Sequence, residues 1–138
     1  MNEQYLFRGK RKDNGEWVEG DLMQWGDEIM RICVDTGNDE KTATTVIPET
    51  VGRCTGLKDK NGKLIFEGDI LESRASENKE DWKRWVVVFF DGSFCFEREI
   101  PKKRKYKHEQ NLLCAGNVEL YGLAVIGNIH DNKDLLEA

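Results

Sequence analysis

The chain has 138 residues, of which 38% are hydrophobic and 34% charged, and its formal net charge is −5. This length allows a compact unit with a hydrophobic core, and the apolar content excludes a wholly disordered chain. The acidic balance argues against a protein that binds nucleic acid through its overall charge alone.

No segment has the length of apolar sequence that a membrane-spanning helix needs. The longest unbroken apolar run covers residues 85–90, whereas such a helix takes about 20 residues. The opening Met1-Asn2-Glu3-Gln4 also lacks the positively charged start of a signal peptide. We therefore expect a cytoplasmic protein with no membrane partner.

Turn signals flanked by apolar residues recur along the chain and predict β-hairpins. Asparagine and glycine tolerate the backbone angles that tight turns require, and they stand together at two places. These two predicted turns are Asn14-Gly15 and Asn61-Gly62.

The cysteines are too far apart in the sequence to indicate a metal site. No two of them have the C-x2-C spacing that brings two thiolates to one zinc ion. We expect reduced thiols, no metal and no cofactor. The four residues are Cys33, Cys54, Cys95 and Cys114.

A pattern of three residues follows both Asn-Gly turns. We interpret each copy as a glycine at a bend, followed by an aspartate whose carboxylate accepts backbone N–H groups two residues on and holds that bend. Two alternatives remain open: a chance similarity of turn residues, and paired carboxylates that serve a metal-dependent hydrolase. The two copies are Glu19-Gly20-Asp21 and Glu67-Gly68-Asp69.

The strongest hairpin signal lies in the second half. Residues 85–90 and 94–96 are β-branched or aromatic for the most part, and Asp91-Gly92 lies between them. Asp-Gly supplies the positive φ angles of a two-residue turn, so we predict a hairpin here.

The remaining segments give weaker signals. Residues 76–82 predict a polar loop with one helical turn, and residues 118–129 predict strand broken at Gly122 and Gly127. Residues 132–136 predict a short helical turn, capped by its asparagine, whose two leucines pack back on the core. We expect a mainly β protein with more than a third strand and less than a tenth helix.

Trp82 is the aromatic residue that we expect to be exposed and to contact a partner, because its surroundings are polar. Phe94 and Phe96 alternate in a predicted strand and so share one face, which favours the core for both. An ordinary packing role for Trp82 is the alternative.

A basic segment in the second half is the candidate for contact with nucleic acid. Its cations suit phosphate groups and its tyrosine suits stacking on a base. The alternative is a solvated loop that joins two strands. The segment consists of Lys102, Lys103, Arg104, Lys105, Tyr106 and Lys107.

Several of these segments, in this order and spacing, resemble the YopX family of phage and prophage proteins. The resemblance covers almost the whole chain and is more specific than any single motif. The segments that carry it are residues 7–11, 14–22, 47–63, 66–70 and 125–129.

The resemblance implies an irregular β-sheet region in residues 1–52 and an SH3-like β-barrel in residues 53–138, the latter ending in a short helical turn. It implies a phage-encoded or prophage-encoded protein of the host cytoplasm and no known activity. With no catalytic spacing in the sequence, we expect a noncatalytic module that binds a host or phage macromolecule. Nucleic-acid binding by residues 102–107 is the alternative, and a homo-oligomer stays open.

The nucleic-acid alternative makes a measurable prediction. Replacing Lys102, Lys103, Arg104 and Lys105 with Gln should weaken binding to DNA or RNA and leave fold stability nearly unchanged. Each phosphate of duplex DNA that the variant no longer binds should flatten the slope of log K against log salt by about 0.9. If the wild-type chain shows no salt-sensitive binding to single or double strands at low ionic strength, the alternative is wrong.

Overall fold

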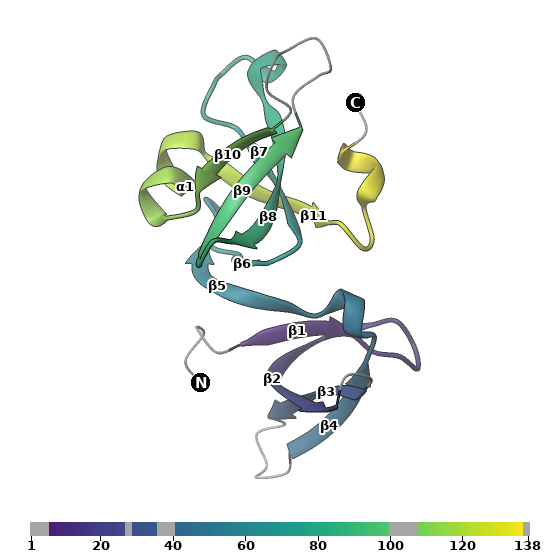
Figure 1. The fold of residues 1–138 in the computed structure, drawn as a ribbon. Helices are drawn as coiled ribbons and strands as arrows, with labels where there is room; N and C mark the ends of the chain where they lie inside the picture. The colour runs from purple at the N-terminus through teal and green to yellow at the C-terminus, as the bar shows by residue number, and fades with distance from the viewer. Residues whose placement is uncertain (1–5, 27–28, 36–40, 100–107, 137–138) are drawn as a thin grey trace. The chain divides into compact units, whose positions relative to one another are not determined.

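The computed structural model describes residues 6–26, 29–35, 41–99 and 108–136, and antiparallel strands dominate it (Figure 1). Strands make up 57% of it, and its α-helix, α1, has seven residues, Ala115–Tyr121. The expectation of a mainly β protein with little helix is confirmed. Within this described part, no helix is both long and apolar enough to cross a membrane.

The chain divides into two compact units, Met1–Cys54 and Thr55–Ala138. The division falls inside strand β5 (Gly52–Lys58), which pairs with β1 (Phe7–Lys10) at its start and continues into the second unit. The boundary that the sequence suggested, between residues 52 and 53, lies at the start of the same strand.

The first unit is a meander in which each antiparallel strand pairs with the next. Backbone hydrogen bonds also join its two ends, because Ile47 N–H donates to the Lys10 carbonyl at 2.8 Å and Lys12 N–H to the Thr45 carbonyl at 3.0 Å. The strands after β1 are β2 (Trp17–Trp25), β3 (Ile29–Asp35) and β4 (Lys41–Val46), and the 3-10 turn η2 (Pro48–Thr50) follows.

The second unit contains a five-stranded antiparallel sheet in the order β10-β9-β8-β7-β11 (Figure 1). Aromatic rings form its core: Trp85 and Phe96 meet edge to face with centroids 4.9 Å apart, and Tyr121 of α1 lies 5.3 Å from Phe96. The elements are β6 (Leu64–Phe66), β7 (Asp69–Ser73), η3 (Lys79–Asp81), β8 (Lys83–Phe90), β9 (Ser93–Glu99), β10 (His108–Leu112), β11 (Leu123–Asn128) and η4 (Lys133–Leu136).

The three predicted hairpin turns are present. Between β8 and β9, Asp91 and Gly92 have φ angles of 51° and 80°, and the flanking Phe90 and Ser93 pair in register. Two consecutive residues with positive φ are what a two-residue hairpin of this twist requires. The other two turns, at Asn14-Gly15 after β1 and Asn61-Gly62 after β5, also form.

The prediction of strand from residue 118 onward is wrong for its first four residues, which belong to α1. Val118 is 7% exposed and packs in the core, and Tyr121, three residues on, packs beside it. An i, i+3 spacing places both on one side of a helix, and packing against the sheet decides for helix over strand. Gly122 ends the helix in the left-handed region, at φ 61°.

Two further irregular segments, in β11 and at η3, form where the sequence predicts them. A register shift in β11 between Val125 and Gly127 confirms the interruption of the strand expected at Gly127. The expected helical turn forms as η3, and its N-cap is Asn78, whose side chain accepts from Glu80 N–H at 3.0 Å.

The short helical turn near the C-terminus is confirmed as η4, but two of its details are wrong. The Oδ1 atom of Asn132 accepts from Asn128 N–H at 3.2 Å instead of capping the turn. Leu136 is 37% exposed and does not pack back on the core, whereas Leu135 is half-buried.

The second copy of the repeated pattern makes the expected bend. Gly68 has a φ of 91° between β6 and β7, its N–H donates to the Val87 carbonyl at 2.9 Å, and its own carbonyl accepts from Ile129 N–H at 2.9 Å. The Asp69 side chain is 1% exposed and accepts from Phe66 N–H at 2.7 Å. The aspartate therefore holds this turn, although its partner lies before it in the sequence and not after it.

The first copy has a different structure, which corrects the expectation of two equivalent bends. Gly20 lies inside β2, where the strand changes partner: it pairs with Phe7 of β1, and the next residue, Asp21, pairs with Cys33 of β3. Its φ is not positive. Glycine is needed here for space, because a Cβ at this position would overlap the Cys33 carbonyl oxygen.

These contacts predict different outcomes for three glycine substitutions. Gly68→Ala should lower the free energy of unfolding by about 1 kcal/mol or more, through backbone strain, and Gly20→Ala should lower it through the clash with Cys33. Gly116→Ala is the control and should not lower the free energy of unfolding. Gly116 lies in α1, its added Cβ would meet only Cys114 Sγ at 4.0 Å, and alanine is more favourable in a helix than glycine by about 1 kcal/mol.

Urea denaturation of the three variants measures these changes. Equal stability of Gly68→Ala and the wild type would contradict the assignment of strain at that turn.

Candidate binding surface

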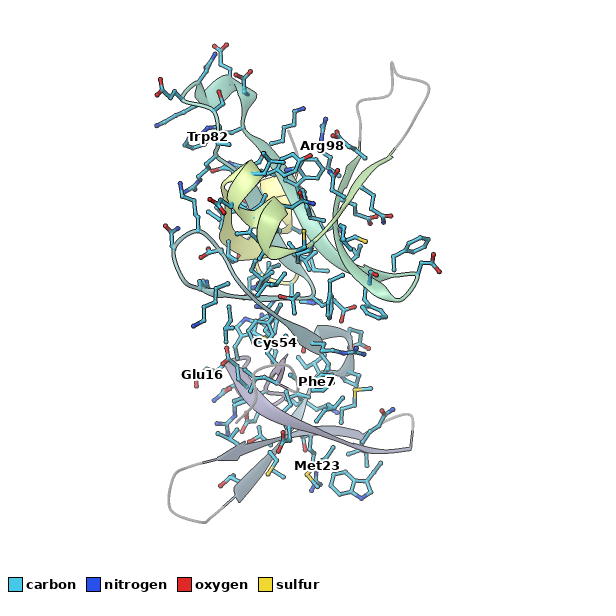
Figure 2. All side chains as sticks on the ribbon, turned by 90° about the vertical axis from the view of Figure 1, so that its left-hand side faces the viewer. Phe7, Glu16, Met23, Cys54, Trp82 and Arg98 are labelled. Atoms are coloured by element: carbon cyan, nitrogen blue, oxygen red, sulfur yellow. The ribbon has the colours of Figure 1, made fainter. Side chains whose placement is uncertain are left out.

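The first unit exposes an apolar cluster on the outward face of its strands. Alternation along β2 puts Met23 and Trp25 on one face, and the register places Arg31 and Ile29 of β3 directly opposite them. Trp25 is 49% exposed, Ile29 45% and Met23 37%. We call these four residues the Trp25 patch; Figure 2 labels Met23 within it.

The Trp25 patch faces solvent because the opposite face of the same strands is the buried one. Ile32 of β3 and Val46 of β4 are 0% and 1% exposed and point inward, so they form the buried side of the sheet. Strand alternation then forces residues 23, 25, 29 and 31 outward, whatever their polarity.

A cation accompanies the exposed indole. The Arg31 guanidinium carbon lies 5.2 Å from the centre of the Trp25 ring, which is a cation–π distance. The half-buried Trp17, at the other end of β2, also has cations over its ring. The Arg8 guanidinium carbon lies 4.9 Å and Lys10 Nζ 5.7 Å from the ring centre. Tryptophan, methionine and arginine are the residue types that protein interfaces favour.

Trp82, which the sequence singled out, is half-buried and not exposed as expected. Its Nε1–H donates to the Ser76 carbonyl at 2.8 Å, and the cations of Arg74 and Lys79 lie 5.2 and 5.8 Å from its ring. The residue stands beside η3 in the second unit (Figure 2). Its polar neighbours in the sequence thus surround the indole instead of leaving it open.

An ion cluster lies next to Trp82. Glu72 of β7 accepts from Arg74 Nε at 2.8 Å and from Arg84 Nε at 3.2 Å, and Arg84 also donates to the Leu135 carbonyl at 2.8 Å. Burial, the largest single influence, raises the pKa of Glu72, but the hydrogen bonds and charges of the two arginines together outweigh it. The pKa of Glu72 therefore lies below its ordinary value of 4.5.

The paired carboxylates of the repeated pattern are placed differently in the two units. Glu19 and Asp21 are exposed on β2 of the first unit, whereas Asp69 of the second unit is buried against the backbone that it holds. Across the described ranges, no group of three or more histidine, cysteine, aspartate or glutamate side chains could hold a metal ion.

Sequence reasoning missed Asp59, a buried aspartate that stands two residues before the second Asn-Gly turn and accepts three backbone N–H groups. It is 6% exposed, its Oδ1 accepts from the N–H groups of Asn61 and Lys63 at 2.8 and 2.9 Å, and its Oδ2 accepts from Val125 N–H at 2.8 Å. An aspartate two residues before Asn-Gly was the available signal for the local bonds. The bond to β11 has no signal in the sequence.

The basic segment, residues 102–107, lies outside the described residues. The strands on either side of it are joined by an ion pair between Arg98 of β9 and Glu109 of β10, at 2.7 Å. Arg98 also lies over the Trp85 ring, 5.4 Å from its centre, so its stem covers part of the core.

One protein family matches nearly the whole chain. It is the YopX protein family, and the match spans residues 6–137. This chain belongs to the YopX family. The match confirms the resemblance carried by the turn and strand segments of the sequence. No curated protein matches this YopX-family chain.

A solved structure shares the fold of this YopX-family chain. The crystal structure of protein EF1440 from Enterococcus faecalis is similar with a TM-score of 0.58, covering 95% of this chain and 96% of that one at 24% identity. At this identity the likeness establishes the common fold alone.

The ion cluster at Glu72 predicts a pH-dependent loss of stability. The unfolded chain, with the higher pKa, takes up the proton first, so the stabilisation is complete above pH 4.5 and is lost as pH falls through the lower pKa of the folded state. Glu72→Gln should cost about 1–2 kcal/mol at pH 7 and progressively less below pH 4.5. Unfolding free energies of both chains from pH 7 to pH 3 measure this, with the exposed Glu77→Gln as control. A constant difference across that range would contradict it.

Proposed function

We propose that this YopX-family protein is a noncatalytic binding module that docks to a protein through the Trp25 patch. The observation that carries the proposal is a tryptophan 49% exposed between exposed methionine and isoleucine side chains on an antiparallel strand pair. Interfaces draw most of their energy from a few such residues, with tryptophan and arginine prominent among them. The patch therefore replaces Trp82 as the proposed contact site.

The chemistry of the patch favours a partner surface with an apolar recess and an acceptor at its rim. The indole, thioether and sec-butyl groups supply contact area, and Arg31, exposed beside Trp25, supplies hydrogen-bond donors. A nucleic-acid partner is less well matched, because Glu19 and Asp21 lie on the same outward face of β2 and repel phosphates.

A noncatalytic role is supported by how the acids of the second unit are used. Asp59 and Asp69 are both buried and accept backbone N–H groups, which fixes turns and leaves these carboxylates unsuited to proton transfer with a substrate.

We further propose that the second unit is an SH3-like barrel and that the protein comes from a phage or prophage, acting in the host cytoplasm. Support for the barrel comes from the five antiparallel strands and from bonds between the β5–β6 turn and β11, including Lys60 N–H to the Leu123 carbonyl at 2.9 Å. Support for the origin comes from family membership.

Trp25→Ala tests the docking proposal. The tagged chain captures host proteins from lysate, and the affinity of each purified partner is then measured by calorimetry for wild type and variant. Loss of a hot-spot tryptophan should weaken binding by about 2 kcal/mol or more, roughly 30-fold. Stability should change little, because the indole is half exposed.

Leu120→Ala provides the matched control. Leu120 is an apolar side chain 69% exposed on α1 of the second unit, and its loss should leave the affinity unchanged. Equal affinities for the wild type and Trp25→Ala would contradict the proposal. Loss of binding in Leu120→Ala alone would move the site to the second unit.

A further inference from the structure

Two carboxylates lie beside the Trp25 patch on the outward face of β2. Glu19 and Asp21 flank the buried Gly20 and are both exposed, so their side chains share the face of Met23 and Trp25. Alternate residues of a strand are roughly 7 Å apart. We call Glu19 and Asp21 the carboxylate pair. It places two like charges side by side in solvent, next to an exposed apolar cluster.

The cations next to Glu19 lie over a tryptophan ring. Arg8 of β1 is directly opposite Glu19 in the register, but its guanidinium carbon lies 4.9 Å from the centre of the Trp17 ring. Lys10, the next outward residue of β1, has its Nζ 5.7 Å from the centre of the same ring. In the part of the chain that the structure describes, Glu19 takes part in no ion pair.

Asp21 has no cation directly opposite it. Its register partner in β3 is Cys33, whose side chain is short and uncharged. Arg31 is opposite Met23, one outward position further along, and its guanidinium carbon lies 5.2 Å from the centre of the Trp25 ring. Among the described residues, Asp21 forms no ion pair either. The neighbouring arginines thus contact the two indoles, and both carboxylates stay open to a cation from outside the chain.

The charge of the whole first unit has the same sign as the carboxylate pair. Residues 1–54 carry 11 acidic and 7 basic side chains, a net charge of −4. A field of this sign speeds the approach of a positively charged partner and slows that of an acidic one. Like charges brought together at an interface weaken it. Charge complementarity therefore favours a basic partner.

We propose that the Trp25 patch and the carboxylate pair together bind a basic peptide segment of a partner protein, with an apolar side chain against Trp25 and a lysine or arginine between Glu19 and Asp21. The outward positions of β2 run in one line from residue 19 to residue 25, about 20 Å, which suits a linear segment. Because β2 is paired on both sides, the segment lies across the face and adds no strand. This choice of partner rests on the proposed docking function of the patch.

Selection from random peptides displayed on phage tests the chemistry of the partner. Extended peptides of about 12 residues cover roughly twice the length of this face. Peptides that the immobilised wild-type chain retains should combine lysine or arginine with an apolar residue. Their affinity for Trp25→Ala should be at least tenfold weaker, because the indole supplies the main contact area.

The double variant Glu19→Gln/Asp21→Asn isolates the contribution of the charges. Fluorescence anisotropy of a labelled, selected peptide should show about fivefold weaker binding at low ionic strength, the size expected of two exposed ion pairs. The difference should shrink as salt is added. Glu77→Gln/Glu80→Gln is the matched control, because it removes two exposed carboxylates from the second unit and changes the net charge equally. Its affinity should be nearly that of the wild type.

A peptide whose basic residue is replaced by glutamine completes the comparison. It should bind the wild type and Glu19→Gln/Asp21→Asn equally, because one member of the ion pair is then absent in both cases.

The possible outcomes separate the partner's chemistry from the docking site. Retained peptides that need Trp25 but carry no lysine or arginine overturn the basic partner and leave the proposed function standing. Peptides that bind Trp25→Ala as well as the wild type contradict the proposed function too. Equal loss in the two double variants, or a library without any binder, also overturns the basic partner.

Discussion

The buried carboxylate of Asp59 is the interaction on which the second unit depends. It binds two N–H groups in its own turn and one in β11, 66 positions further along the chain. A buried carboxylate is costly unless its oxygens are paired, so the turn and the last strand have to be in place together. Asp69 plays a similar part in the next turn, where it ties β7 back to β6.

Aromatic residues show how the same side chain takes different roles in different surroundings. Trp85 is 1% exposed in the core of the second unit, Trp82 is enclosed by its own loop, and Trp25 is 49% exposed in the first unit. Arginines accompany all three rings at 5.2 to 5.4 Å. Burial of the indole, and not the presence of a cation, therefore distinguishes a structural tryptophan from one that can meet a partner.

Sequence reasoning was reliable where the physical cause is local. The Asp91-Gly92 turn follows from which residues tolerate positive φ, and the bend at Gly68 follows from the same rule. Reasoning from sequence neighbours was unreliable for exposure: Trp82 has polar neighbours and is half-buried, whereas Trp25 occupies an ordinary strand and is exposed. The side of a strand that faces solvent depends on which residues the partner strands bury.

The sequence by itself determined the β-rich class, the three hairpin turns and the family, because turn chemistry and strand alternation act over a few residues. The tertiary structure decided that residues 115–121 form a helix, that Gly20 is needed for space, and that Asp59 reaches β11. It also decided the order of the strands in the second sheet, β10-β9-β8-β7-β11. Each of these depends on contacts between residues far apart in the chain, and such contacts exist only once the sheets have formed.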